Sequence, residues 1–265
     1  MDRVLAWLGR HLAGYLLQPR RQGAQVATSP PEKLAGALEP GDVVLIEGNT
    51  RLSVVIKYLT QSTWSHSALY VGDALGVPRP GQEPEVLIEA DLREGVRAVP
   101  LSHYAGLHTR ICRPVGLSPE DLLKVIGFAV SRIGEPYDLK NVLDLARYLL
   151  PTPPVPSRWR RRMLALGSGD PTRAICSTLI AQAYESVRYP ILPMYVPPQA
   201  SEHAKDAREE LLHIRHYSLF TPRDFDISPY FAIVKPTLAH GFEYRKLHWA
   251  QDAAVPGLPE FLETN

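Results

Sequence analysis

The sequence predicts an α+β domain in which an antiparallel sheet packs against a central helix. Short β-branched runs, each closed by Gly, Pro, Asp or Asn, occupy residues 41–115, and helical spacing of apolar residues follows after residue 117. Because most of the strands come before most of the helices, we expect an antiparallel sheet and not a series of β–α–β units.

Six strands are expected. They are DVVLIEG from Asp42, SHSALYVGD from Ser65, EVLIEAD from Glu85, GVRAVPL from Gly95, HTRICRPV from His108 and an edge strand at 230–234. Each early run combines β-branched or aromatic residues with a turn residue at its end, which is typical of strands. Between the first two strands, RLSVVIKYLTQS at 51–62 is expected to be a helix.

Helical signals dominate the second half of the chain. Ser118 and Pro119 are the residue types of an N-cap and a first helical position, and two acidic residues follow them. Further helices are expected at 139–150, where the prolines of TPPVP would end the helix, from near Ala174, and at 201–212.

The composition indicates a globular chain whose net charge gives no overall attraction to nucleic acid or acidic surfaces. The 265 residues are 45% hydrophobic and 22% charged, with a formal net charge of +1, so nucleic acid is not an expected partner. Two cysteines cannot form a disulfide framework and suit a reducing compartment.

Residues 22–40 are rich in Ala, Gly and Pro and are interpreted as a linker. We expect a helix and linker at 1–39, a domain at 40–236 and an extension at 237–265.

The N-terminal segment MDRVLAWLGRHLAGYLLQPRRQ is interpreted as an amphipathic helix, because its apolar residues recur at three- and four-residue spacing. Asp2, Arg10 and His11 interrupt the apolar run that a signal peptide needs, and no stretch reaches the ~20 apolar residues of a membrane span. The helix either packs on the domain or docks on a membrane surface through residues 1–20. We therefore expect a cytoplasmic protein, with peripheral membrane association as the alternative.

The segment RAICSTLIAQAY at 173–184 places a cysteine in the first turn of an expected helix. Backbone N–H groups and the positive end of the helix dipole favour a thiolate at that position, so Cys176 is a candidate nucleophile. Packing is the alternative, because free cysteine is among the most often buried residue types.

A nucleophilic cysteine needs a base and a group that orients the base. His66, at the start of an expected strand, is the best-placed histidine, and Ala68 leaves room beside it. Glu89 is a carboxylate within an apolar strand, where an unpaired charge would be costly, and a pair with His66 would account for it. Each residue also has an alternative explanation when it is considered alone. His66 would then be a structural histidine, and Glu89 would lie on an exposed edge.

Five short motifs, in this order, resemble the circularly permuted papain-like amidases of the YaeF/YiiX type, which belong with the NlpC-type cysteine peptidases. They are GDVVLIEG from Gly41, SHSALYVGD from Ser65, IEA at 88–90 with GV at 95–96, GEPYD at 134–138 and ICSTLI at 175–180. The resemblance covers residues 40–236. His66 precedes Cys176 in this chain, which is the permuted order.

The resemblance implies a permuted papain-like fold and a thiol hydrolase. It carries the nucleophile to Cys176, the general base to His66, the orienting acid to Glu89 and a supporting position to Tyr137. The implied reaction is acyl transfer through an acyl-enzyme on Cys176, for which no metal or cofactor is needed. Cys112 matches no motif and is expected to be structural.

The acyl donor stays open between amides of peptides and acyl chains of lipids, because relatives of this architecture include both. The basic segment PTPPVPSRWRRRML at 151–164 bears on that choice. If it covers the site, Arg158, Arg160 and Arg161 would hold phosphate or carboxylate groups and Trp159 would meet acyl chains; a solvated charged surface is the alternative. A non-catalytic lipid- or peptide-binding module on the same scaffold is the second functional hypothesis.

Overall fold

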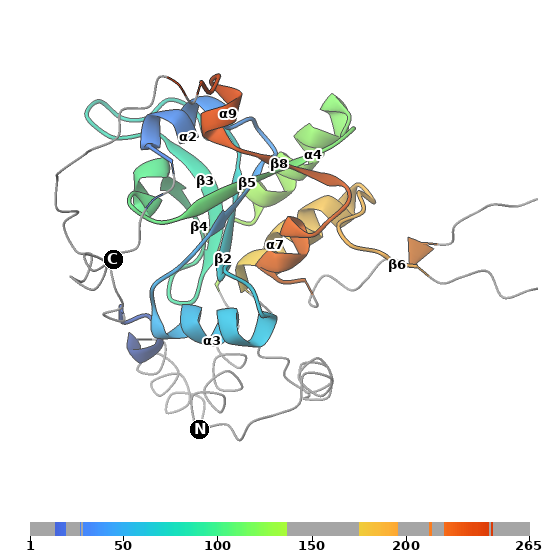
Figure 1. Cartoon of the computed structure of the whole chain (residues 1–265), viewed down its shortest axis with the longest axis horizontal. Helices are drawn as coiled ribbons and strands as arrows, with labels where there is room; N and C mark the ends of the chain where they lie inside the picture. Colours follow the sequence, from blue (N-terminus) through green and yellow to red (C-terminus); the bar gives the residue numbers. More distant parts are fainter. Residues whose placement is uncertain are drawn as a thin grey trace, which may run out of the picture.

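The computed structural model describes residues 14–19, 27, 29–136, 175–195, 212–213, 220–243 and 245, with the backbone alone at 175, 176, 194, 195, 212 and 213. Its centre is a six-stranded antiparallel sheet in the order β4-β3-β2-β1-β5-β8 (Figure 1). The strands are β1 (Val43–Ile46), β2 (His66–Tyr70), β3 (Glu85–Asp91), β4 (Gly95–Pro100), β5 (Thr109–Pro114) and β8 (Phe231–Val234). The predicted fold class is confirmed, and β8 is an edge strand as expected.

The helices and short elements around this sheet are α2 (Pro31–Ala37), α3 (Arg51–Thr60), η1 (Leu101–Tyr104), α4 (Pro119–Ser131), α7 (Ile175–Ser186), α8 (Pro222–Asp226), α9 (Pro236–Ala239) and the pair β6 (Met194–Tyr195) and β7 (Leu212–His213). Helix α4 begins as predicted, with the Ser118 hydroxyl accepting a hydrogen bond from the Asp121 backbone N–H at 3.1 Å. The helix expected at 139–150 lies outside the described residues, as does 201–211 of the helix expected at 201–212. Leu212, the last residue of the latter, lies in β7 and not in a helix.

Apolar side chains cover both faces of the sheet because successive strand residues point to opposite sides. On one face, Leu69 and Ile88 pack with residues of α4 and α7, among them Ile180. On the other face, Ala68 and Leu87 pack with residues of α2 and η1. Helix α7 lies against β2, β3 and α4, so the expected central helix is present (Figure 1).

Helix α2 lies within the segment that the sequence predicted to be a linker. Its first residue is Pro31, and Leu34 and Ala37 are buried against the sheet face that carries Leu87. A segment rich in Ala and Pro forms a short helix when tertiary contacts bury its apolar side chains, and composition alone does not reveal those contacts. The linker prediction is therefore wrong for residues 31–37.

The described end of the N-terminal segment packs against helix α3. Residues 14–16 are helical, and Leu16 is fully buried. The Arg51 guanidinium donates a hydrogen bond to the Tyr15 hydroxyl at 2.9 Å and lies over the Tyr15 ring. At these residues the contacts are those of a helix packed on the domain, and residues 1–13 of the expected amphipathic helix lie outside the described residues.

Candidate active site

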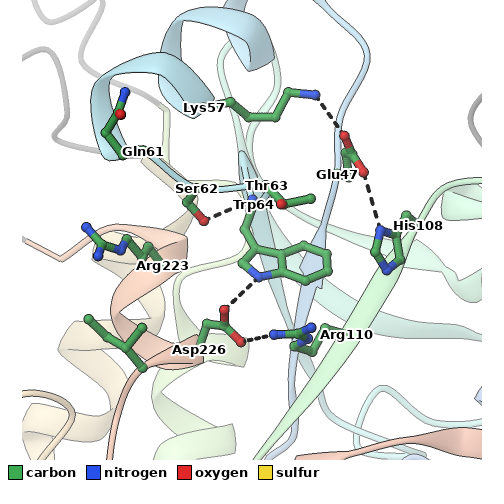
Figure 2. Close-up of a pocket in the computed structure, with 11 residues that line it drawn as sticks. Glu47, Lys57, Gln61, Ser62, Thr63, Trp64, His108, Arg110, Arg223 and Asp226 are labelled. Carbon is green, nitrogen blue, oxygen red and sulfur yellow. Dashed lines mark hydrogen bonds and ion pairs between the residues drawn. The ribbon is translucent and has the colours of Figure 1, made fainter. Parts of the chain in front are cut away.

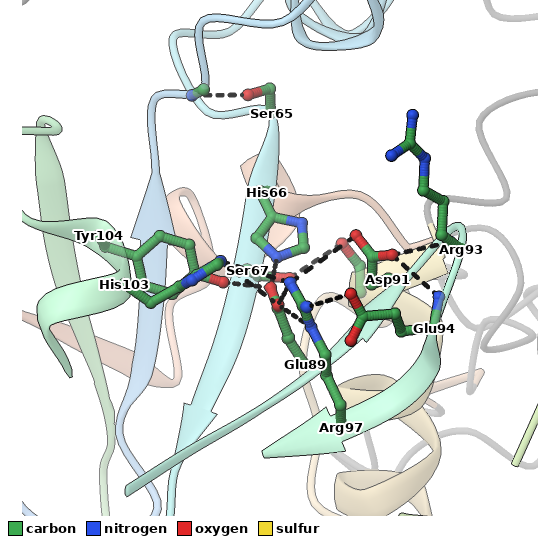
Figure 3. A network of polar contacts seen from close by, with 12 residues as sticks. Ser65, His66, Ser67, Glu89, Asp91, Arg93, Glu94, Arg97, His103 and Tyr104 are labelled. Carbon is green, nitrogen blue, oxygen red and sulfur yellow. Dashed lines mark hydrogen bonds and ion pairs between the residues drawn. The ribbon is translucent and has the colours of Figure 1, made fainter. Parts of the chain in front are cut away.

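His66 and Glu89 lie beside each other on neighbouring strands of the sheet (Figure 3). The antiparallel register pairs Leu69 of β2 with Ile88 of β3, so Ala68 faces Glu89 and His66 lies diagonally across from it on the same side. His66 Nε2 contacts Glu89 Oε2, so the predicted pair is present.

Glu89 is a buried carboxylate with donors on both oxygens; its exposed fraction is 2%. The Tyr104 hydroxyl donates to Oε2, the oxygen that His66 contacts, and the Arg97 Nε–H donates to Oε1 at 2.9 Å. Burial by itself raises the pKa of Glu89, but the hydrogen bond and charge of His66, with Tyr104 and Arg97, outweigh burial and hold this pKa well below its usual value. Glu89 is therefore an anion at neutral pH.

Sequence reasoning missed Arg97 and Tyr104. Arg97 is directly across from Glu89 in the β3–β4 hairpin, so the hairpin register is a signal that would have found it. Arg97 also pairs with Glu94 at 2.9 Å. Tyr104 comes from η1, a single turn after β4, and no spacing rule in the sequence predicts that its hydroxyl reaches β3.

The beginning of α7 lies next to the beginning of β2. The hydroxyls of Ser67 and Ser177 are 3.4 Å apart, and both residues are fully buried. Ser67 follows His66 and Ser177 follows Cys176, which is the second residue of α7. The predicted nucleophile and the predicted base are therefore chain neighbours of two side chains that touch.

The faces of the sheet limit how Cys176 and His66 could meet. Ser67 points to the face that α7 covers, and by alternation His66 points to the face that carries Tyr104. His66 is the first residue of β2, so its ring stands at the end of the sheet, beside the start of α7. The His66 ring and the first turn of α7 therefore lie at the same end of the sheet.

Other predicted site residues lie outside the described residues: Tyr137, Arg158, Trp159, Arg160 and Arg161. The first residues of the GEPYD motif are described. Gly95 has a φ of 76°, and a Cβ there would be 2.2 Å from the Glu135 carbonyl oxygen, which accepts a hydrogen bond from Val96 N–H at 3.0 Å. Glycine at position 95 thus lets this motif pair closely with β4.

Cys112 is fully buried in the middle of β5 and packs in the apolar cluster between the sheet and α7. Burial, followed by the negative charge of Asp226, raises the pKa of the Cys112 thiol far above its usual value. This position fits the structural role expected for it.

Residues 37–148 match the family described as permuted papain-like amidase enzymes, YaeF/YiiX, of the C92 family. The predicted family resemblance is confirmed. Among solved structures, a similar chain is the crystal structure of yiiX from Escherichia coli O157:H7, described as a metalloprotein. It shares 17% identity and has a TM-score of 0.43, with 75% of this chain and 97% of that chain covered. No curated protein matches.

The permuted papain-like amidase match supports a papain-like cysteine amidase or peptidase, and an amidase family implies a peptide or amide substrate. The matched region contains His66 and Glu89 and ends before Cys176. The assignment of Cys176 thus depends on the ICSTLI motif and on the position of α7.

Two absences concern the described part of this chain. Within it, no helix is both long and apolar enough to cross a bilayer. Across the same residues, no group of three or more His, Cys, Asp or Glu side chains could hold a metal ion.

Proposed function

We propose that the protein is a thiol amidase in which Cys176 is the nucleophile, His66 the general base and Glu89 the group that orients the base. One observation carries the proposal: a buried, ionised Glu89 contacts His66 Nε2 at the end of the sheet where α7 begins. A structural ion pair would not need its histidine beside the first turn of a cysteine-bearing helix.

Glu89 decides which nitrogen of His66 carries out the chemistry. Because Nε2 contacts the carboxylate, Nδ1 is the nitrogen that exchanges a proton with the thiol of Cys176. The carboxylate also stabilises the imidazolium that forms when Nδ1 takes that proton. Tyr104 and Arg97 keep Glu89 ionised and fix its orientation, so they are positioning residues.

The reaction proceeds in two acyl transfers. The sulfur of Cys176 attacks the amide carbon and its proton moves to His66 Nδ1; backbone N–H groups in the first turn of α7 stabilise the resulting oxyanion. The C–N bond then breaks, the leaving amine takes the proton from Nδ1, and a thioester remains. Water, deprotonated by His66, attacks the thioester carbon, and the C–S bond breaks to release the acid and restore the thiol.

An amide or peptide is the substrate class that this proposal favours, because the family match is to amidases. The acyl-lipid alternative depends on the basic segment 158–162 and on residues 1–13, both outside the described residues. It therefore gains no support from the contacts described above.

The pH dependence of iodoacetamide alkylation at Cys176, read by mass spectrometry, tests the proposal. Wild type should be labelled rapidly well below pH ~8.5, the usual thiol range, and His66→Ala should slow the labelling. Cys112 is the internal control, because it is buried and its thiol pKa is raised. Labelling of Cys176 that ignores His66 and is no faster than that of Cys112 would contradict catalysis and favour a non-catalytic binding module.

A further inference from the structure

A second polar site lies on the face of the sheet that α8 covers. It is a cavity of about 650 Å³, open to solvent, with walls from the end of β1, from α3 and the loop after it, from β5 and from α8 (Figure 2). Lining residues that bear on its chemistry are Glu47, Lys57, Trp64, His108, Arg110, Arg223 and Asp226. None of these belongs to the triad proposed above.

Both carboxylates in the cavity already have cationic partners. Glu47 accepts a hydrogen bond from Lys57 Nζ at 3.1 Å and lies 3.3 Å from His108 Nδ1. Asp226 accepts from the Trp64 indole N–H at 3.0 Å and from the Arg110 guanidinium. Figure 2 shows these two groups on adjoining walls of the cavity.

Arg223 differs from Lys57 and Arg110 in its partner. Its guanidinium donates to the Thr60 carbonyl oxygen at 3.2 Å, and among the described residues it has no carboxylate partner. Among the described lining residues, three permanent cations, Lys57, Arg110 and Arg223, thus face two carboxylates across one cavity. The surplus of one positive charge matches one singly charged anion.

The cavity is at the same end of the sheet as His66. Ile46 of β1 pairs with His66 on one side and with Thr109 on the other; Glu47 and His108, which line the cavity, are the next residues along the chain. Trp64, which forms another wall, is two residues before His66. The cavity is on the face that α7 and α8 cover and the His66 ring is on the other face, so a substrate that reaches both would pass around this end of the sheet.

We propose that this cavity is a subsite for a carboxylate of the substrate, so that the amide cleaved belongs to a peptide or amino-acid derivative with a free carboxylate. That the bound molecule is a substrate rests on the proposed amidase function, whereas binding of a carboxylate in the cavity does not depend on it. Arg223 makes the main contact, with its planar guanidinium binding both carboxylate oxygens. The indole of Trp64, with Arg110 over its ring at 4.9 Å, forms an apolar and cationic wall beside it.

A carboxylate fits better than a phosphate for a reason of charge. A phosphate monoester carries about −1.5 to −2 at neutral pH, and Glu47 and Asp226 would repel the second charge. A carboxylate carries the single charge that the surplus cation balances.

The test uses ¹⁵N-tryptophan-labelled Cys176→Ala protein, which cannot turn over the probe through Cys176, and follows the indole N–H signal of Trp64 by NMR. Substituting Trp7, Trp159 and Trp249 by Phe in turn assigns the other three signals. The probe is N-acetyl-Ala-Ala with a free carboxylate, compared with its C-terminal amide and with inorganic phosphate. The carboxylate should shift the Trp64 signal saturably. Its dissociation constant should be at least about tenfold lower than that of the amide or of phosphate.

Charge variants locate the binding. Arg223→Gln should weaken it about tenfold or more, Arg223→Lys should give a smaller loss, and Arg79→Gln, which removes an exposed arginine outside the cavity, should leave it unchanged. Circular dichroism confirms that each variant is folded. Equal affinity for acid and amide, tighter binding of phosphate, or indifference to both Arg223 variants would overturn the subsite.

The two proposals can fail separately. A reactive Cys176 without carboxylate binding would overturn the subsite alone. An unreactive Cys176 together with saturable, Arg223-dependent binding would overturn the amidase mechanism and leave the cavity as a carboxylate-binding site.

Discussion

Two buried carboxylates, Asp42 just before β1 and Glu89 in β3, have different surroundings. Asp42 is 0% exposed and Glu89 is 2% exposed. Arg113 donates to both oxygens of Asp42 at 2.8 Å, and the Glu39 backbone N–H donates at 2.8 Å, so every partner of Asp42 belongs to the scaffold. Glu89 instead contacts His66, an imidazole that can take up and release a proton.

The two carboxylates also lie near opposite ends of α7. The Tyr184 hydroxyl, near the end of the helix, donates to the Gly41 carbonyl oxygen next to Asp42. Ser177, at the helix start, touches Ser67 beside His66. Both carboxylates pair their buried charge, and their partners Arg113 and His66 are similarly exposed, at 25% and 24%. Of the two partners, only the imidazole of His66 is a group that can act as a base near neutral pH. Asp42 thus has the surroundings of a structural carboxylate, and Glu89 has those of a carboxylate suited to catalysis.

Removing Asp42 should produce the largest effect on stability. Asp42→Ala leaves Arg113 without its buried partner, and we expect a loss of about 3 kcal/mol in the free energy of unfolding. Urea denaturation measures this loss, and alkylation of Cys176 in the folded variant should be unchanged. If Cys176 in the fully folded Asp42→Ala variant reacted more slowly than in wild type, Asp42 would also influence the thiol, and its purely structural role would be contradicted.

Tyr104→Phe should cost about 2 kcal/mol of unfolding free energy, because it deletes a buried hydrogen bond to an ionised carboxylate while keeping the ring. The pKa of Glu89 should rise toward its usual value, since one of the groups that lower it is lost. Carbon-13 NMR of the Glu89 carboxyl during an acid titration measures the change. An unchanged pKa would show that Tyr104 does not hold the anion.

Glu89→Gln should lower the rate of Cys176 alkylation at pH 6 about tenfold, which corresponds to about 1.4 kcal/mol, because an amide does not stabilise the imidazolium. The matched variant Asp42→Asn should alkylate at the wild-type rate. Equal rates in wild type and Glu89→Gln would exclude the orienting role of Glu89.

The pH dependence of stability should have opposite signs at the two carboxylates. The pKa of Glu89 is lowered in the folded protein, so its contribution is present above about pH 4.5 and is lost as the pH falls below that value. Burial, opposed by Arg113, raises the pKa of Asp42, so its contribution decreases as the pH rises above 3.8 toward the folded pKa. Urea denaturation between pH 3 and 7 should show Glu89→Gln losing the first dependence and Asp42→Asn the second; identical profiles would contradict this.

Ser177→Ala should have the smallest effect, about 1 kcal/mol or less, because it leaves the Ser67 hydroxyl without this contact. Double-mutant comparison with Ser67→Ala isolates the coupling of the two hydroxyls. Alkylation of Cys176 should shift slightly if the start of α7 moves relative to β2. Full additivity of the two substitutions would show that the contact does not couple the helix to the strand.

Much of the fold follows from local sequence. Alternating β-branched runs and the Ser118-Pro119 helix start are local signals, and the structure has a strand or helix at each of them. Helix α2 was not predicted because burial of Leu34 and Ala37 is a tertiary event. The His66 and Glu89 pair was predictable because an unpaired charge in an apolar strand needs a partner, whereas the approach of Tyr104 was not.

The sequence by itself determined the residue types of the proposed chemistry, the strand and helix pattern and the family resemblance. Each of these depends on residues that are close together in the chain. Only the tertiary structure decided that Glu89 has three donors, that Ser67 meets Ser177 and that Arg223 faces two paired carboxylates. These contacts join segments far apart in the chain. Their distances depend on how strands pair and helices pack, which no local pattern specifies.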